Sequence, residues 1–140
     1  MNGGGEFVTG LVELGIILLG SRFRFEGRVP SEKALDGIDV LLFLNPNEPS
    51  GRVVAEAQIA GITVVVPNAG GASEFVEHGK TGFRFRPGDA SSAAAVLDEA
   101  LTFASRNESV ALSIREYAQA AYDAVGQSRK YEAALDVSTR

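Results

Sequence analysis

The sequence predicts an α/β fold, with a Rossmann-like parallel sheet and flanking helices. Two short apolar runs, IDVLLFLN at 38–45 and ITVVVP at 62–67, are each followed by a helical pattern. Short strands that alternate with helices are typical of βα units, whose strands lie parallel. The length of 140 residues and the apolar content of 45% fit a single folded domain over residues 1–140.

Three elements are predicted in the first part of the chain. EFVTGLVELGIILL at 6–19 has apolar residues at helical spacing, although its glycines weaken the pattern and its end, IILL, also suits a strand. RFRFEGRV at 22–29 alternates with period two, which predicts a strand with Phe23 and Phe25 facing inward. SEKALDG at 31–37 predicts a short helix that stops at its glycine.

The middle of the chain carries the strongest patterns. The run at 38–45 is almost continuously apolar and stops before Pro46, so we expect a central strand buried on both faces. SGRVVAEAQIAG at 50–61 predicts a helix that ends at Gly61, and ITVVVP repeats the buried-strand pattern. The apolar face of that helix comprises Val53, Val54, Ala57 and Ala60.

Shorter elements and two long helices complete the prediction. GGASEFVEHG at 70–79 predicts a glycine turn and a short helix, and TGFRFRPGD at 81–89 a short strand and a turn. The Ala-rich segments 90–104 and 109–135 are amphipathic and predict helices, the second with a candidate kink at Gly126.

Composition excludes several classes of function. Thirteen basic and 18 acidic residues give a net charge of -5 without a basic cluster, which argues against nucleic acid as a partner. The absence of cysteine and the single histidine argue against disulfides and a zinc site. The longest apolar stretch, GIILLG at 15–20, is far shorter than the roughly 20 residues that span a bilayer. With no secretory signal pattern, a cytoplasmic location is predicted.

The loop NPNEPSG at 45–51 is the main candidate site. It joins a predicted strand to a helix, whose free N–H groups and dipole favour an anion, and Gly51 would let a phosphate approach the backbone. Since a carboxylate accepts two hydroxyls at once, Glu48 could hold a hexose hydroxyl and Glu56 a ribose diol. Alternatively, Glu48 is an acid placed favourably near a helix start, and Glu56 pairs with Arg52 on a solvated face.

Other polar features have two interpretations each. The glycine pair in GGAS at 70–73 could let backbone amides approach a ligand, or could simply permit a tight turn. His78 fits a surface turn better than an acid or base. The alternating arginines could form a basic patch, but outer strand faces explain them better. These arginines are Arg22, Arg24, Arg84 and Arg86.

The segment from 38 to 90 resembles family 4 of the retaining glycosyltransferases, which have the GT-B fold. The family pattern has an apolar strand ending in Pro, an acid, seven residues and a second acid, then a Gly before a Val-rich strand. IDVLLFLNPNEPSGRVVAEAQIAGITVVVP matches it, and GGASE, GKTG and RPGD match the segments that follow. The resemblance implies the donor-binding, C-terminal GT-B domain of an enzyme that transfers a hexose from a nucleoside-diphosphate sugar with retention, without a metal or other cofactor.

The resemblance also implies roles for individual residues. Glu48 would orient the donor sugar as the catalytic-site acid, and Glu56 would bind the ribose. Main-chain atoms near Arg28 and Val29, in FRFEGRVP, would meet the nucleotide base. The remaining residues would lie near the phosphates or the sugar, namely Ser50, Gly51, Arg52, Val53, Gly70 and Gly71.

Two departures from the family pattern set further expectations. MNGGGEFVTGLVEL is similar to the turn and helix after the second donor-domain strand, so we expect an incomplete donor domain. The first strand with its Gly-Arg and Lys, and the acceptor domain, have no counterpart in this sequence. We therefore expect no transfer by this chain alone; the alternative is a non-catalytic nucleotide-binding or interaction module. The open edge of IDVLLFLN would be covered by RFRFEG or IILL of the same chain, by a homo-oligomer or by the missing half on another polypeptide.

Overall fold

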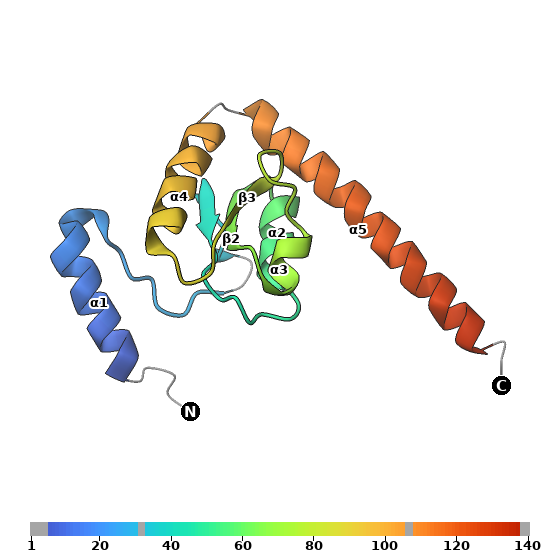
Figure 1. The fold of residues 1–140 in the computed structure, drawn as a ribbon, viewed down its shortest axis with the longest axis horizontal. Helices are drawn as coiled ribbons and strands as arrows, with labels where there is room; N and C mark the ends of the chain where they lie inside the picture. The colour runs from blue at the N-terminus through green and yellow to red at the C-terminus, as the bar shows by residue number, and fades with distance from the viewer. Residues whose placement is uncertain (1–5, 31–32, 106–107, 138–140) are drawn as a thin grey trace. The chain divides into compact units, whose positions relative to one another are not determined.

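The computed structural model describes residues 6–30, 33–105 and 108–137, and the chain divides by its contacts into two compact units. The first unit is Met1–Asp36 and the second is Gly37–Arg140. The first contains α1 (Glu6–Leu19) and the short 3-10 helix η1 (Gly20–Arg22). The elements of the second unit follow along the chain in Figure 1. They are β1 (Val40–Leu42), α2 (Arg52–Ile59), β2 (Thr63–Pro67), α3 (Gly70–Glu74), β3 (Gly82–Phe85), α4 (Ala90–Ala104) and α5 (Glu108–Val137).

In the first unit, the predicted helix at 6–19 is confirmed, and its IILL end is helical rather than extended. Gly15, which weakened the helical pattern, has a packing role. A Cβ atom at this position would lie 2.5 Å from the ring of Phe23, so the missing side chain makes room for an aromatic ring on the helix. The chain therefore turns back on α1 after η1.

The predicted strand at 22–29 is wrong. Arg22 ends η1, and the residues that follow form no strand; Phe25 is 57% exposed instead of facing inward. A strand needs a neighbour for its backbone groups, and no strand among the described residues pairs with this segment. Arg24 and Glu26, which are two residues apart in this segment, form an exposed ion pair instead.

The short helix predicted at 31–37 lies partly outside the described residues. Residues 33–37 form turns, in which the N–H of Asp36 donates to the carbonyl of Lys33 at 3.2 Å. Gly37 has φ +70°, a left-handed conformation that suits glycine. The chain therefore changes direction here before β1.

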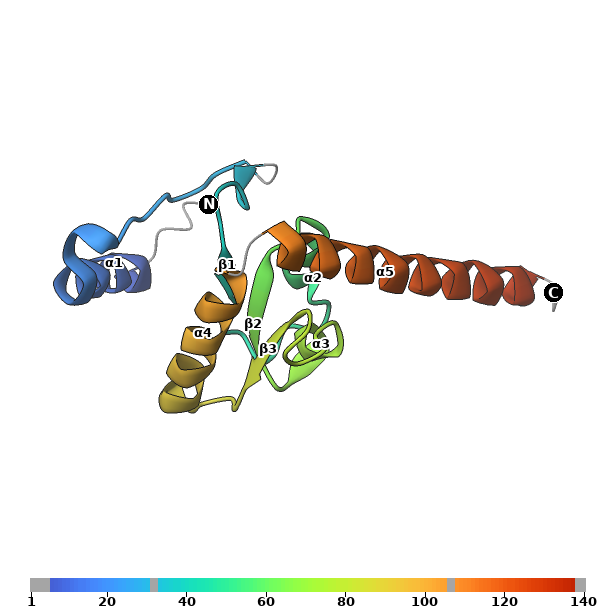
Figure 2. The same ribbon diagram turned by 90° about the horizontal axis from the view of Figure 1, so that it is seen from above.

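The second unit confirms the predicted fold class. Its three strands are parallel, in the order β1-β2-β3, with Leu41 opposite Val64 and Val65 opposite Phe83. Helix α4 covers one side of this sheet, whereas α2, α3 and α5 lie on the other (Figure 2). Both strand-to-helix connections of the predicted βα units are therefore present.

One expectation for the sheet is wrong, because β1 is not the central strand. β2 lies between β1 and β3, and all its residues are buried. Among the described residues β1 pairs only with β2, so Leu42 is 38% exposed, and Leu44 just beyond the strand is 60% exposed. Apolar composition indicates that a segment prefers burial, but it does not determine how many strands flank it.

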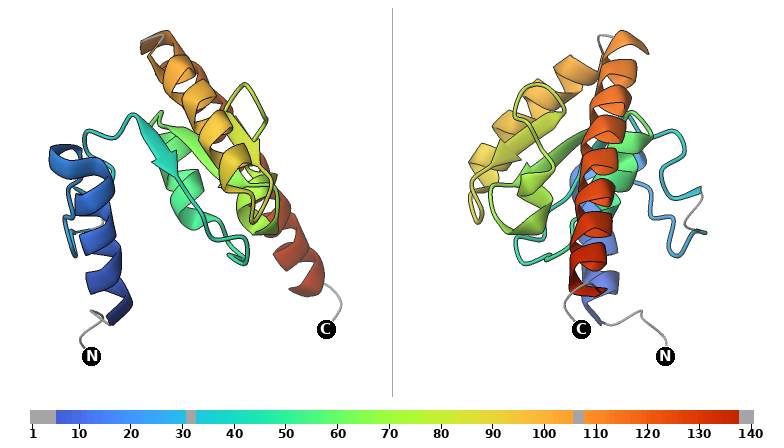
Figure 3. Two further views of the ribbon diagram at one scale, coloured as in Figure 1. Left: turned by 60° about the vertical axis from the view of Figure 1, so that its left-hand side comes forward. Right: turned by 90° about the vertical axis from the view of Figure 1, so that its right-hand side faces the viewer.

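Helix packing completes the second unit. On one side, Val65, Phe83, Phe85 and Ala100 form a core between the sheet and α4. Asp89 caps α4, since its carboxylate accepts from the Ser92 N–H at 2.8 Å. On the other side α5 packs beside α2 (Figure 3).

The long C-terminal helix is continuous. α5 runs from Glu108 to Val137 without a break at Gly126, so the helix is confirmed and the kink is not. Across the described ranges, every helix is either too short or too polar to span a bilayer.

Candidate functional site

The loops that follow β1 and β2 are interlocked at the carboxyl end of the sheet. The N–H of Gly71 donates to the carbonyl of Glu48 at 3.0 Å. A Cβ atom at Gly70 would lie 2.6 Å from the Pro46 carbonyl oxygen, and one at Gly71 would overlap that of Pro49. The glycine pair is therefore required for this close approach, and the Gly71 amide is already occupied. In parallel α/β sheets, ligands bind beyond the carboxyl ends of the strands, where these loops lie.

The start of α2 depends on a third glycine. Gly51 has φ +58° and precedes α2, and a Cβ atom there would lie 2.9 Å from Ala72 Cα and 3.0 Å from the Phe75 ring. Glycine thus permits both the left-handed turn and the contact with α3. The amides of Val54 and Ala55 both donate to the Gly51 carbonyl, at 3.0 and 3.1 Å.

Intrahelical bonding therefore begins at Val54. The N–H groups of Arg52 and Val53 precede it, at the positive end of the helix, which is the arrangement that binds anions.

The Glu48 carboxylate folds over this helix start. It accepts from the Ser50 hydroxyl at 2.6 Å and from the Ser50 N–H at 3.3 Å. The side chain is thus held against Ser50, two residues before α2 begins. This position agrees both with a ligand-binding acid and with an acid that only stabilises the positive end of the helix.

Glu56 lies one turn further along α2. Its carboxylate is 3.4 Å from Nη2 of Arg52, and both side chains are more than half exposed. An exposed pair of this kind contributes only about 0.3–0.5 kcal/mol. The ion pair that the alternative interpretation predicts is therefore present, but it is too weak to prevent Glu56 from binding a ligand.

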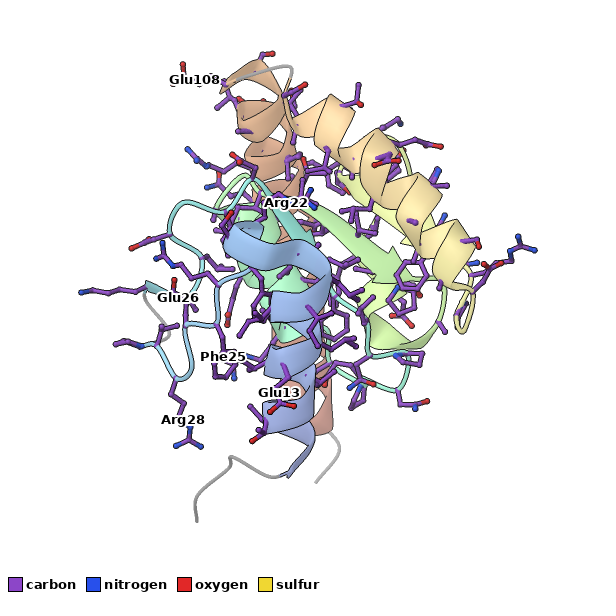
Figure 4. All side chains as sticks on the ribbon, turned by 90° about the vertical axis from the view of Figure 1, so that its left-hand side faces the viewer. Glu13, Arg22, Phe25, Glu26, Arg28 and Glu108 are labelled. Carbon is purple, nitrogen blue, oxygen red and sulfur yellow. The ribbon has the colours of Figure 1, made fainter. Side chains whose placement is uncertain are left out.

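The structure brings most of the predicted site residues together in the second unit. These are Glu48, Ser50, Gly51, Arg52, Val53, Gly70 and Gly71, with Glu56 on the same helix. Arg28 and Val29 belong to the first unit, where both are exposed and Arg28 points outward (Figure 4). Their predicted contact with a nucleotide base stays a prediction.

Sequence reasoning missed Gln58, which is only 1% exposed. Its Nε2 donates to the carbonyl of Phe75 at 2.9 Å and to that of Thr81 at 3.3 Å, so it joins α2 to the segment after α3 and to the start of β3. The available signal was a glutamine next to Ala57 on the predicted apolar face. A polar side chain in such a position must find buried partners.

His78 and the arginines of β3 have structural roles. His78 Nδ1 accepts from the Arg84 N–H at 3.0 Å, and its ring meets Phe83 edge-on, so the surface-turn interpretation fits. Arg84 and Arg86 are exposed while Phe83 and Phe85 are buried, as expected for the outer face of a strand.

Neither a metal-binding cluster nor one of the two larger cavities marks the loops after β1 and β2 as a site. Within the ranges that the structure describes, no three His, Cys, Asp or Glu side chains gather as a metal site would require. Two cavities of about 480 and 470 Å³ are lined by Gly79 and Phe103, among others, and share no lining residue with the loops. We locate the candidate site from the loop geometry, because the helix start and the two acids lie there.

Comparison with known proteins identifies the class to which this fold and site belong. The structure resembles that of Anabaena HepE in complex with UDP, with a TM-score of 0.77 and 28% identity, over 98% of this chain and 38% of HepE. The HepE complex with UDP-glucose gives a TM-score of 0.74. Sucrose-phosphate synthase of Thermosynechococcus elongatus gives 0.72 and 25% identity, over 93% of this chain and 34% of that one. These structural neighbours are GT-B glycosyltransferases.

The family follows from the sequence match. Residues 14–120 match the model for glycosyl transferases group 1, so the chain belongs to this family. It is 43% identical over 54 residues to a sulfoquinovosyl transferase of Arabidopsis thaliana. It is 40% identical over 76 residues to a 2-deoxystreptamine N-acetyl-D-glucosaminyltransferase of Niallia circulans. The matches span 36% and 53% of this chain but only 11% and 18% of those relatives.

Proposed function

We propose that this chain is the donor-binding part of a family 4 retaining glycosyltransferase and binds a nucleoside-diphosphate sugar. The observation that carries the proposal is the Gly71–Glu48 hydrogen bond, because it holds the Glu48 loop at the start of α2. A donor diphosphate would then meet the amides of Arg52 and Val53. HepE, a structural neighbour, has been solved with UDP and with UDP-glucose, which supports this ligand class.

In this proposal the two acids bind opposite ends of the donor. Glu48 orients the hexose, and Glu56 accepts hydrogen bonds from the ribose hydroxyls. Ser50 and Gly51 line the diphosphate, Gly70 and Gly71 shape the wall beside it, and Arg28 and Val29 meet the base. The helix terminus stabilises the charge that develops on the leaving diphosphate. No metal or other cofactor is required, and the site is cytoplasmic, where nucleotide sugars would reach it.

Calorimetric titration with UDP, GDP and ADP tests the binding site. We expect weak but measurable binding of at least one nucleotide. Glu56→Ala should weaken that binding by about 1–3 kcal/mol, because charge-assisted hydrogen bonds to ribose are lost. Glu99→Ala, which removes an acid from α4 across the sheet, should leave the affinity unchanged. If no nucleotide produces heat at millimolar concentration, the donor site is not present.

Sugar transfer by these 140 residues alone is not expected. The chain covers only 38% of HepE, and its sequence has no counterpart of the family's pyrophosphate-binding Gly-Arg and Lys. The measurement is turnover of a labelled nucleotide sugar by the pure chain, compared with Glu48→Ala. Turnover that exceeds this variant would show that the chain is catalytically sufficient.

The second candidate function is a non-catalytic interaction module. The exposure of Leu42 and Leu44 along β1 favours it, because open apolar strand edges recruit other strands. Nucleotide binding that is lost on Glu56→Ala favours the donor site, whereas association without nucleotide binding favours the module.

A further inference from the structure

A second concave site lies between α2, α3 and α5, on the side of the sheet opposite α4. It is a cavity of about 200 Å³. Its walls carry three aromatic rings, two alanines, one amide and one carboxylate. The lining residues are Gln58, Glu74, Phe75, Tyr117, Ala118, Ala121 and Tyr122. None of them belongs to the candidate donor site.

The spacing of residues on α5 explains why space remains there. Tyr117 and Tyr122 carry large rings, while Ala118 and Ala121 between them are too small to fill the gap. The Phe75 ring, at the end of α3, packs against the Tyr122 ring, with the centroids 5.5 Å apart and the planes inclined by 32°. These two rings therefore form one aromatic wall, beside which lie the two alanines and the Tyr117 ring.

The polar groups of the cavity are acceptors. Both amide hydrogens of Gln58 are used by the carbonyls of Phe75 and Thr81, which leaves its amide oxygen as the group that it can offer. Glu74 adds an exposed carboxylate, and among the side chains that the structure describes no Lys or Arg lines the cavity. An anion would be repelled here, and a neutral apolar molecule would leave both oxygens unmatched.

Tyr122 presents a neutral ring at physiological pH. Burial raises the pKa of Tyr122 to about 12, and within the part of the chain that the structure describes its buried hydroxyl has no hydrogen-bond partner. Lys80 lowers the pKa of Glu77, as does, to a smaller extent, a hydrogen bond with Tyr117.

We propose that this cavity binds a small organic cation with a methylated ammonium group. Aromatic rings and a carboxylate that line the same cavity are the chemistry that recognises such groups, because the ring quadrupoles and the negative charge attract a cation that cannot donate hydrogen bonds. The size is adequate, since an apolar cavity of about 150 Å³ already holds benzene. Phe75 stands between this cavity and Gly51, so a cation site and the candidate anion site lie on either side of one ring.

Choline and its neutral isostere 3,3-dimethyl-1-butanol test the proposal. Titration is followed by NMR of the Ala118 and Ala121 methyl groups, with folding checked by circular dichroism. We expect saturable shifts with choline and roughly tenfold weaker binding of the alcohol, as for a cation–π site of about 1–2 kcal/mol. Equal binding of the two, or no saturation with choline at millimolar concentration, would overturn the proposal.

Four variants test where the cation binds. Tyr117→Leu removes one ring from a residue that is 44% exposed, so the fold should tolerate it, and Glu74→Gln removes the charge at constant shape. Each should weaken choline binding by roughly threefold or more. Tyr122→Phe keeps its ring, and Glu99→Gln lies on α4, so both should retain binding. If Tyr117→Leu and Glu74→Gln bind choline like the original chain, the cavity is only a packing defect.

Discussion

The strands β1 and β2 have similar sequences but different surroundings. Both come from apolar runs, and both lead into a loop at the candidate site. Yet Val64, Val65 and Val66 of β2 are fully buried, whereas Leu42 of β1 is 38% exposed. The difference arises because, within the described part of the chain, β2 has a strand on each side and β1 has one. An apolar run thus predicts a strand, while its neighbours determine how much of it is buried.

A matched pair of substitutions gives the largest effect. Val65→Asp places a carboxylate in the core against α4, where it has no partner, and should cost more than about 4 kcal/mol. Because small domains are stable by only about 5–15 kcal/mol, this variant should lose most of its cooperative unfolding transition. Leu42→Asp, at the open edge, should cost about 1 kcal/mol or less. Urea denaturation compares the two; similar losses would mean that both strands are equally buried.

The two strands also show what could be predicted from the sequence. The alternation at 22–29 was regular, but a strand also needs a partner, which no local pattern reveals. The position of β1 at the edge was missed for the same reason.

The candidate site was predictable in part. The order strand, loop, helix can be read from the sequence, and it predicted that Glu48 lies in the loop and Glu56 on the helix that follows. Two facts required the three-dimensional fold: Gly71 bonds to the Glu48 carbonyl, and Gly51 faces Phe75. These contacts join loops about twenty residues apart, so no spacing within one loop indicates them. The same applies to the aromatic cavity, which is built from three helices.

The loop after β2 offers an intermediate effect. Gly71→Ala would push a Cβ atom into the Pro49 carbonyl and should cost about 1–3 kcal/mol, because the two loops must separate. Gly10→Ala is the matched control, since no atom lies within 4 Å of its Cβ position and α1 should gain up to about 1 kcal/mol in helix propensity. Thermal unfolding of both variants measures the difference.

The two substitutions are expected to change the free energy of unfolding in opposite directions. If Gly71→Ala were neutral, the interlocked loops would not be a structural requirement, and the glycine pair would need a different explanation.

The smallest expected effect concerns the edge of β1, and it tests association rather than stability. Within the described residues, no strand covers this edge, and Leu42 and Leu44 are exposed beside it. Because such edges recruit strands, we expect the pure chain to self-associate or to bind a partner instead of remaining a monomer.

Sedimentation across a concentration series measures this association. Leu42→Lys should raise the concentration at which it begins by roughly tenfold, or about 1.4 kcal/mol, since an edge lysine opposes strand addition. Leu101→Lys on α4 starts from a leucine that is 48% exposed and should have no such effect. A compact monomer with a cooperative melt at every concentration would show that the chain closes its own edge, because only a covered edge leaves nothing for a second strand to pair with.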